Sequence, residues 1–171
     1  MNWLVETLLR LARLDAGSVR FRRDELSAAE LVRRAAEPLA IPLELRNVAL
    51  DVSAGDERLT GDLFWTAEAL GNVLRNAVEH TPAGGRIEVA ARETPLFTEL
   101  TVRDTGPGFA PEDLPRLFER FYRGRGAAPE SVGIGLALAR EIAAAQNGTL
   151  SAENARNGGA LFTFRFYKTV V

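Results

Sequence analysis

Residues 72–82 read NVLRNAVEHTP and close a helix that we expect to run from about Asp62 to His80. One side of this helix is apolar and would face a core, at Leu63, Phe64, Ala67, Leu70, Leu74 and Val78. Beside it, Asn72, Asn76 and His80 are spaced four apart and therefore stack in a row. Asn is a poor helix former, so two aligned in mid-helix need a reason. The row is either a solvated face or a set of neutral ligands, in which an amide oxygen binds a magnesium ion held mainly by nucleotide phosphates.

The segments on either side of this helix predict a sheet that helices cover on one face. Strands are expected where apolar residues alternate or cluster, at 48–52, 87–91, 100–102, 149–153 and 161–166. A capping box at Ser27 and Glu30 begins a helix that Pro38 and Pro42 end near residue 39, and another helix covers about 135–146. These elements predict an α+β fold, a two-layer α/β sandwich with a mixed, mostly antiparallel sheet.

Composition and charge narrow the class of protein. The 171 residues carry 21 Lys and Arg against 23 Asp and Glu, a formal net charge of −2, and 46% are hydrophobic, as in an ordinary single globular domain. Without a basic stripe, nucleic acid is not an expected partner. The absence of cysteine excludes disulfides, cysteine catalysis and thiolate metal sites. No stretch is apolar enough to cross a bilayer, so we expect no direct membrane contact from this chain.

The first residues predict a separate amphipathic helix. Leu4, Leu8 and Leu11 form one stripe between residues 3 and 14, and Asp15-Ala16-Gly17 would end the helix. The stripe has no evident local packing partner. It is therefore either a face for a partner helix or the end of a longer, truncated element, and we favour the truncated element.

Asp104 is the second unusual residue. It shares strand parity with Leu100 and Val102 and would point to the same buried face, where an unpaired carboxylate would cost several kcal/mol. No Lys or Arg at the right parity is near, and the exocyclic amine of adenine would supply a hydrogen bond. Gly106 and Gly108 follow, although Gly-Pro-Gly by itself is only a turn.

Two further glycines, Gly133 and Gly135, lie just ahead of the helix at 135–146, where free N–H groups and the helix dipole favour a phosphate. They form neither a dinucleotide-binding fingerprint nor a Walker loop. The preceding residues 117–125, LFERFYRGR, combine aromatic side chains with arginines that suit phosphate oxygens, unless they only pin a loop. The whole connection 105–132 is long enough to be a lid.

In combination these segments resemble the N, G1, F and G2 boxes of the histidine kinase catalytic domain, a member of the GHKL group of ATP-binding domains with the Bergerat fold. The matching segments are 72–82, 104–108, 117–123 and 133–137, and Gly158-Gly159-Ala160 is similar to a closing glycine segment of the family. Residues 1–17 resemble the end of the second helix of the dimerisation and phosphotransfer domain. The resemblance thus divides the chain into this helix end, 1–17, and an ATP-binding catalytic domain, 18–171.

The resemblance implies a role for each matching residue. Asn76 would bind Mg²⁺, Asn72 and His80 would contact phosphate or ribose, and Asp104 would hold the adenine amine. Arg123 would steady the γ-phosphate of ATP, so that Arg123 and Asn76 are the expected catalytic residues. The rest of the ATP site would be formed by Gly106, Gly108, Phe121, Tyr122, Gly133, Ile134, Gly135 and Leu136.

The implied function is transfer of the ATP γ-phosphate to a histidine on the chain's own dimerisation domain, absent here, and then to the receiver domain of a response regulator. The full-length protein would be a homodimer, and this part the cytoplasmic domain of a membrane-anchored bacterial sensor. Asn72 replaces the Glu that activates water in related ATPases, which favours a kinase. His80 lacks the sequence context of a phosphoacceptor, so the chain alone should bind ATP without phosphorylating itself. The role of Glu79, where many relatives have Lys, stays open. The alternative is a degenerate or anti-sigma-type nucleotide-binding module that acts through protein binding.

Overall fold

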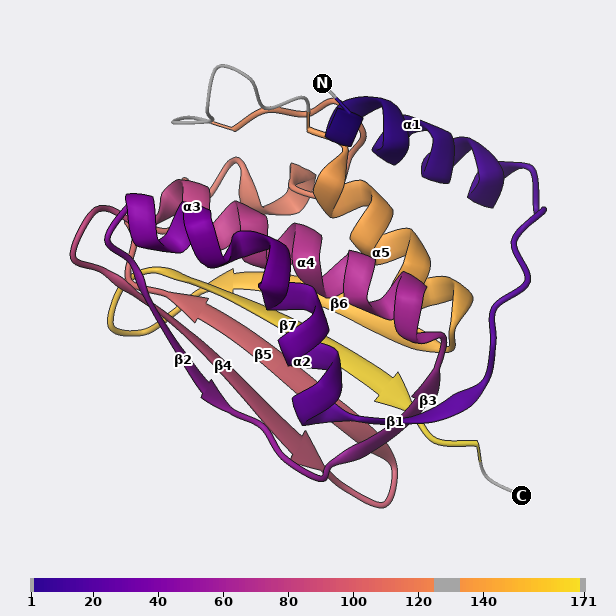
Figure 1. Ribbon diagram of the computed structural model, residues 1–171. Coiled ribbons are helices and arrows are strands. Elements are labelled where there is room, and N and C mark those ends of the chain that lie inside the picture. Colours follow the sequence, from indigo (N-terminus) through magenta and orange to yellow (C-terminus); the bar gives the residue numbers. More distant parts are fainter. Residues whose placement is uncertain (1, 125–132, 170–171) are drawn as a thin grey trace.

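The computed structural model describes residues 2–124 and 133–169 and shows a sheet with helices packed on one of its faces (Figure 1). The helices are α1 (Asn2–Asp15), α2 (Ala28–Ala36), α3 (Ala40–Leu45), α4 (Leu63–His80) and α5 (Gly135–Ala145), with the 3₁₀ helices η1 (Glu37–Leu39) and η2 (Leu114–Arg116). The strands are β1 (Asp24–Ser27), β2 (Ala49–Ser53), β3 (Arg58–Gly61), β4 (Arg86–Glu93), β5 (Phe97–Asp104), β6 (Gly148–Asn154) and β7 (Ala160–Tyr167).

The main sheet has five strands in the order β2-β4-β5-β7-β6. Only the β2–β4 pair is parallel; the other neighbours are antiparallel. Val102 of β5 lies opposite Val89 of β4 and Phe162 of β7, so one apolar row crosses the centre of the sheet. The expected two-layer α/β sandwich with a mostly antiparallel sheet is confirmed.

Helices α4 and α5 cover the apolar face of the sheet and form the core with it. Leu70 and Leu74 of α4, Leu138 and Ile142 of α5, and Phe162 of β7 are at most 1% exposed. Phe64 does not join them, contrary to the sequence prediction, and is 45% exposed. Trp65 takes the buried place instead, while the guanidinium of Arg10 lies over the Phe64 ring, 5.2 Å from its centroid.

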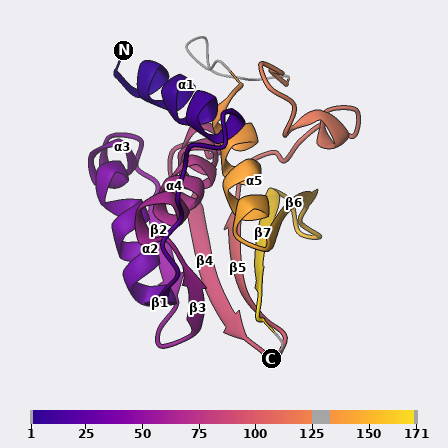
Figure 2. The same ribbon diagram turned by 90° about the vertical axis from the view of Figure 1, so that its right-hand side faces the viewer.

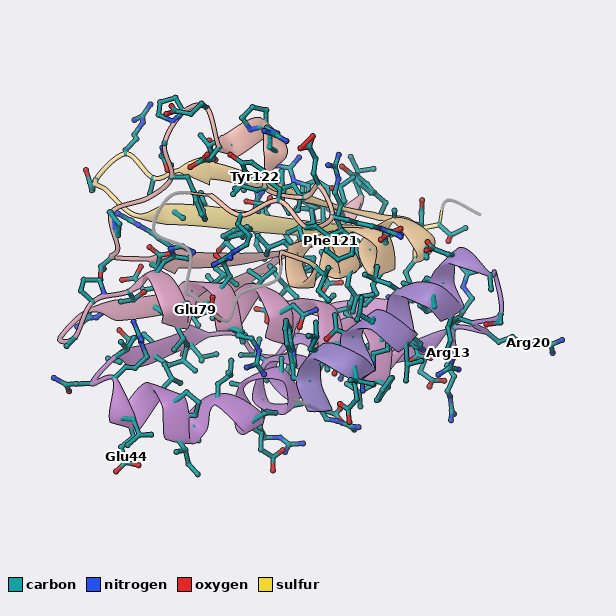
Figure 3. The ribbon with its side chains drawn as sticks, turned by 90° about the horizontal axis from the view of Figure 1, so that it is seen from above. Arg13, Arg20, Glu44, Glu79, Phe121 and Tyr122 are labelled. Atoms are coloured by element: carbon teal, nitrogen blue, oxygen red, sulfur yellow. The ribbon has the colours of Figure 1, made fainter. Side chains whose placement is uncertain are left out.

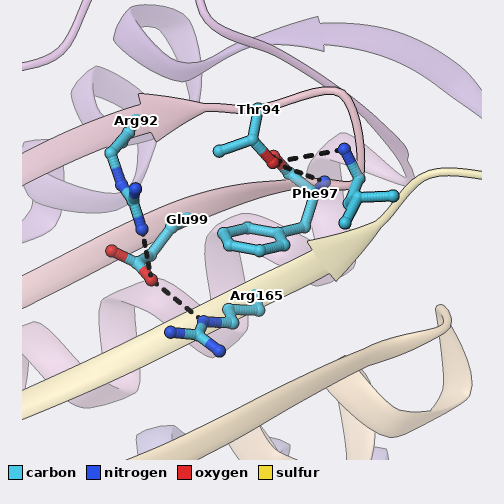
Figure 4. A network of polar contacts seen from close by, with 6 residues as sticks. Arg92, Thr94, Phe97, Glu99 and Arg165 are labelled. Carbon is cyan, nitrogen blue, oxygen red and sulfur yellow. Dashed lines mark hydrogen bonds and ion pairs between the residues drawn. The ribbon is translucent and has the colours of Figure 1, made fainter.

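The opposite face of the sheet is polar and carries an ion-pair network (Figure 4). Glu99 of β5 accepts from Arg92 at 3.4 Å and from Arg165 at 2.9 Å, across both neighbouring strands. Both guanidinium groups also approach the ring of Phe97, at 5.7 Å and 4.8 Å from its centroid. The hydroxyl of Thr94 accepts from the backbone N–H of Phe97 and closes the β4–β5 turn. This face therefore remains solvated while the helices cover the other one.

The region before α4 is more structured than the sequence predicts. The N-cap at Ser27 is confirmed, because the Ser27 hydroxyl accepts from the Glu30 backbone N–H at 3.2 Å, but α2 ends at Ala36. Pro42 does not stop the helical path; it lies within the first turn of α3, where a missing N–H is tolerated. The antiparallel pair β1–β3 was not predicted, since each strand is only four residues long.

Helix α1 lies on the outer side of the helical layer, over α5 (Figures 1 and 2). Thr7 and Leu11 are buried and Leu4 packs against the core, whereas Leu8 is 40% exposed. Arg10 also binds Glu68 of α4 at 2.8 Å. The expectation that this helix has no local packing partner is therefore wrong. No helix among the described residues combines the length and apolar character needed to cross a membrane.

Candidate nucleotide site

A cavity of about 160 Å³ opens between α4, the N-terminal end of α5 and the segment that follows β5. Eight of the residues predicted for the ATP site line this cavity, although they come from three distant parts of the sequence. They are Asn72, Asn76, His80, Tyr122, Arg123, Gly133, Gly135 and Leu136. The fold thus brings the N-box row, the end of the F-box and the G2 glycines to one place.

The polar row on α4 gives the site its direction. Asn72 lies at the α5 end, where its Nδ2 donates to the carbonyl of Gly135 at 3.1 Å. His80 lies at the β5 end, because its carbonyl oxygen meets Gly106 so closely that a Cβ there would overlap it. Eight residues of α-helix span roughly 12 Å. The row therefore runs from a helix N-terminus, suited to phosphates, to the residues around Asp104.

Asn76, in the middle of the row, has the features of a cation ligand. Its Oδ1 is buried and has no hydrogen-bond partner among the described residues. A buried, unpaired carbonyl oxygen carries a desolvation penalty that a bound cation would remove. Nowhere in the described segments do three His, Asp or Glu residues gather as a ready-made metal site. The residues present therefore fit Mg²⁺ that takes one amide oxygen from the protein and its other ligands from phosphates and water.

Asp104 is buried and only half satisfied by the protein. Its Oδ1 accepts from the backbone N–H groups of Gly106, at 2.9 Å, and Ala160, at 3.2 Å. Within residues 2–124 and 133–169, Oδ2 receives no hydrogen bond. The partners that the sequence did not predict are thus backbone N–H groups, which bind one oxygen and leave the other for a donor such as the expected adenine amine. Asp104 itself is not in the cavity lining.

His80 is held as a neutral imidazole. Burial lowers its pKa, the Asp104 carboxylate opposes this effect, and the Arg46 guanidinium adds to it. The ring meets that of Phe109 edge to face, with centroids 5.3 Å apart. A neutral imidazole offers one N–H donor and one acceptor, which suits a contact with ribose or a base.

Gly133 closes the base of the segment between β5 and α5. It has a φ of +75°, and a Cβ at this position would overlap the carbonyl oxygen of Tyr122. Its own carbonyl accepts from the N–H of Phe121 at 2.8 Å. The residues on either side of 125–132 are therefore hydrogen-bonded to each other, while residues 125–132, the last part of the expected lid 105–132, lie outside the described residues.

Tyr122 is fixed on the other side of the cavity by a buried carboxylate. Its hydroxyl donates to Asp113, which is 4% exposed, and this hydrogen bond raises the pKa of Tyr122. The guanidinium of Arg116 lies over the ring at 4.2 Å. In Figure 3, Tyr122 and Glu79 mark the two sides of the site. Glu79, whose role the sequence left open, is among the residues that line the cavity.

Some predicted residues lie outside the cavity and others were missed. Phe121 is 60% exposed (Figure 3), the Ile134 side chain is in the core, and Gly106 and Gly108 do not line the cavity. The structure adds lining residues that the prediction did not include, namely Trp3, Arg75, Phe109, Leu117 and Gly124. Arg75 and Leu117 belong to the quoted motifs and Phe109 directly follows one of them, so these three could have been found there. No sequence motif marks Trp3 as a site residue, because it reaches the site only through the docking of α1.

Known proteins support this geometry. Residues 61–170 match the family model of histidine kinase-, DNA gyrase B- and HSP90-like ATPases. Sensor protein CreC of Escherichia coli (strain K12) is 35% identical over 98% of this chain and 35% of its own length. Signal transduction histidine-protein kinase AfsQ2 of Streptomyces coelicolor is 36% identical over 96% of this chain and 30% of its own.

The crystal structure of full-length ShkA in complex with AMPPNP aligns with 98% of this chain and 36% of that one, at a TM-score of 0.80 and 28% identity. The chain spans about a third of the length of CreC and AfsQ2. The match with the family model covers well over half of the chain. The chain therefore belongs to the histidine kinase-, DNA gyrase B- and HSP90-like ATPase family, a family of ATP-binding domains.

Proposed function

We propose that this chain is the ATP-binding kinase domain of a sensor histidine kinase and transfers the γ-phosphate of ATP to a histidine on a dimerisation domain. The phosphate would pass on to the receiver domain of a response regulator. The whole protein would be a homodimeric, membrane-anchored sensor with this domain in the cytoplasm. The relatives support this proposal, since AfsQ2 is a histidine-protein kinase and ShkA binds AMPPNP.

The observation that carries the proposal is the divided hydrogen bonding of Asp104. Two backbone N–H groups fix Oδ1, so Oδ2 is a preorganised acceptor at the end of the site remote from α5. An exocyclic amine of adenine is the donor that such an oxygen fits. Guanine offers a carbonyl oxygen at the corresponding ring position, and two acceptor oxygens would repel each other. The site therefore favours adenine nucleotides.

At the other end, the elements around α5 suit the phosphates. The N-cap residue Ile134 makes no side-chain cap hydrogen bond, which suits the first-turn N–H groups of α5 to an anion. Arg123 lines the same cavity and would neutralise charge on the γ-phosphate. Asn76 would hold Mg²⁺, which when bound neutralises the phosphate oxygens during transfer. These residues position the substrate and offset its charge, which is most of what phosphoryl transfer requires.

Two features favour transfer over hydrolysis. Asn72 lies where related ATPases have a water-activating Glu, and its amide, already bonded to Gly135, cannot accept a proton. The chain has one histidine, and His80 lines the nucleotide cavity with a lowered pKa. It is therefore suited to contact the nucleotide rather than to accept its phosphate, and the acceptor belongs to another segment.

Calorimetric titration with AMPPNP, with and without Mg²⁺, tests the proposal on the wild type and on Asp104→Asn. Asn keeps an Oδ1 that can accept both backbone hydrogen bonds but replaces Oδ2 by a donor. We expect the wild type to bind AMPPNP in the micromolar range, and more tightly with Mg²⁺. Asp104→Asn should unfold at nearly the same temperature as the wild type but should not bind AMPPNP. Absence of binding to the folded wild type would overturn the proposal, and so would equal binding of AMPPNP to Asp104→Asn.

A further inference from the structure

The nucleotide cavity shares a wall with a second cavity. Trp3, Asn72 and Arg75 line both the 160 Å³ nucleotide cavity and a neighbouring space of about 390 Å³ between α1, α2 and α4. The wall consists mainly of an indole and a guanidinium, since Arg75 lies over the Trp3 ring at 5.0 Å from its centroid. The size of the nucleotide cavity thus depends on where Trp3 is.

With this wall in place, the nucleotide cavity of about 160 Å³ and the neighbouring space of about 390 Å³ are separated by Trp3, Asn72 and Arg75, which line both. The indole is therefore the group that limits the cavity on the α1 side.

The wall lies at the phosphate end. A Cβ built on Gly135, the first residue of α5, would be only 3.5 Å from Cζ2 of Trp3 and 3.7 Å from Cγ of Asn72. The indole thus packs against the helix N-terminus at which a phosphate would bind. The carbon edge at Cζ2 displaces water and offers a phosphate no hydrogen bond, since the only donor of the indole is its Nε1–H. The indole also engages the Arg75 guanidinium, which would otherwise be available to a phosphate oxygen.

Contacts farther along α1 hold Trp3 in this position. Leu11 is buried, and Arg10 binds Glu68 of α4 at 2.8 Å. At the end of the helix, Asp15 binds Arg120 at 2.6 Å. The indole of Trp3 therefore lies at the phosphate end when α1 is docked.

We propose that Trp3 is a gate that sets the selectivity of the site for the number of phosphates. While α1 is docked, the indole opposes a γ-phosphate more than it opposes the rest of the nucleotide. Binding of a triphosphate displaces the indole and, by reciprocity, loosens the N-terminal end of α1. This inference rests on the proposed function, because it requires a nucleotide in this cavity.

The test compares the Kd values of AMPPNP and ADP for the wild type, Trp3→Ala and a control, Leu9→Ala. Leu9 is on the same helix but is 59% exposed and lines neither cavity. We expect Trp3→Ala to bind AMPPNP roughly three- to tenfold more tightly, which is the scale of a lost cation–π contact, with a smaller change for ADP. Leu9→Ala should match the wild type for both nucleotides.

A second measurement follows Trp3 itself. The chain has two tryptophans, so Trp65→Phe leaves Trp3 as the only indole. AMPPNP should shift its emission to longer wavelength as the ring leaves Gly135 and Arg75 for water. Unchanged or weaker AMPPNP binding by Trp3→Ala would overturn the gate alone, as would an unaltered emission at saturating AMPPNP. If neither the wild type nor Trp3→Ala binds any nucleotide, the proposed function fails and the gate with it.

Discussion

The guanidinium of Arg120 holds the carboxylate of Asp15 with two hydrogen bonds, of 2.8 Å and 2.6 Å, although 105 residues separate the two in sequence. The same guanidinium donates to Glu141 of α5 at 2.6 Å. The pKa of Asp15 is lowered because it accepts from Arg120. Arg120 therefore connects three parts of the fold, which are the end of α1, the segment that leads to Tyr122, and helix α5.

Loss of this contact should loosen α1. In Arg120→Gln we expect the backbone amides of α1 to exchange with solvent several-fold faster, because its C-terminal end loses its only ion pair among the described residues. Hydrogen exchange measured by mass spectrometry would report this. Since the pair is partly exposed, added salt should have the same effect on the wild type.

Arg116→Gln is the matched control for that experiment. Arg116 pairs with Glu119, three residues along the same segment, and its removal breaks no ion pair to α1. Its α1 exchange should equal that of the wild type. Unchanged exchange in Arg120→Gln at low salt would mean that buried residues such as Leu11 alone determine the docking of α1.

The lowered pKa of His80 should make stability depend on pH. In the unfolded chain this histidine binds a proton below its ordinary pKa near 6.5, whereas burial keeps it neutral in the fold. As pH falls below 6.5, the unfolded state therefore binds more protons and the free energy of unfolding decreases. The free energy of unfolding stops decreasing once the pH is below the pKa that His80 has in the folded state.

Because the chain has a single histidine, His80→Asn should remove this dependence cleanly. Urea unfolding at pH 7.5, 6.5 and 5.5, values roughly spanning the histidine range, would show a falling stability for the wild type and a flatter profile for the variant. Identical slopes for the two proteins would mean that His80 titrates alike in both states.

Local signals in the sequence were sufficient for the elements that build the site. Helix α4 was predicted almost to the residue from its apolar positions, and the structure adds Asp62 as its N-cap. Asp104 was recognised from strand parity alone, since an acidic residue on a buried face is rare. What could not be predicted was the backbone pair on its Oδ1, because Ala160 reaches Asp104 only when β7 pairs with β5.

The position of α1 shows why the remainder could not be predicted. Its stripe of leucines suits a partner helix in another domain as well as the chain's own α4 and α5. The ion pairs that dock α1 on this chain join Arg10 to Glu68 and Asp15 to Arg120, and no local sequence pattern indicates either pair. Trp3 reaches the nucleotide cavity only as a consequence of that docking.

Gly106 should tolerate no side chain. A Cβ there would overlap the carbonyl oxygen of His80, so Gly106→Ala forces apart β5 and the end of α4. We expect a loss of about 1–3 kcal/mol in the free energy of unfolding, as for other overpacked sites, and impaired binding of AMPPNP. Gly55→Ala is the control, because its nearest neighbour would be 3.9 Å away. Equal unfolding midpoints for the two variants would contradict the expected overlap.

Asp62 should contribute more than an ordinary helix cap, since it caps the helix that carries the nucleotide row. Its Oδ1 accepts from the N–H of Trp65 at 3.1 Å and its Oδ2 from the N–H of Arg22 at 2.9 Å, and the side chain is buried. Asp62→Ala leaves both donors without a partner, and we expect it to lower the free energy of unfolding by about 2–4 kcal/mol. Urea denaturation would measure the loss.

The comparison for this prediction is Ser27→Ala at the start of α2. Ser27 accepts a single hydrogen bond, from Glu30 at 3.2 Å, and that bond is exposed, so its loss should be about 0.5–1 kcal/mol. The loss of unfolding free energy in Asp62→Asn should lie between those of Asp62→Ala and Ser27→Ala. The amide retains an acceptor for the N–H of Trp65, but it either presents a donor to the N–H of Arg22 or loses that contact. If Asp62→Ala and Ser27→Ala cost the same, the second hydrogen bond of Asp62 adds nothing, and α4 is held in place by its apolar face alone.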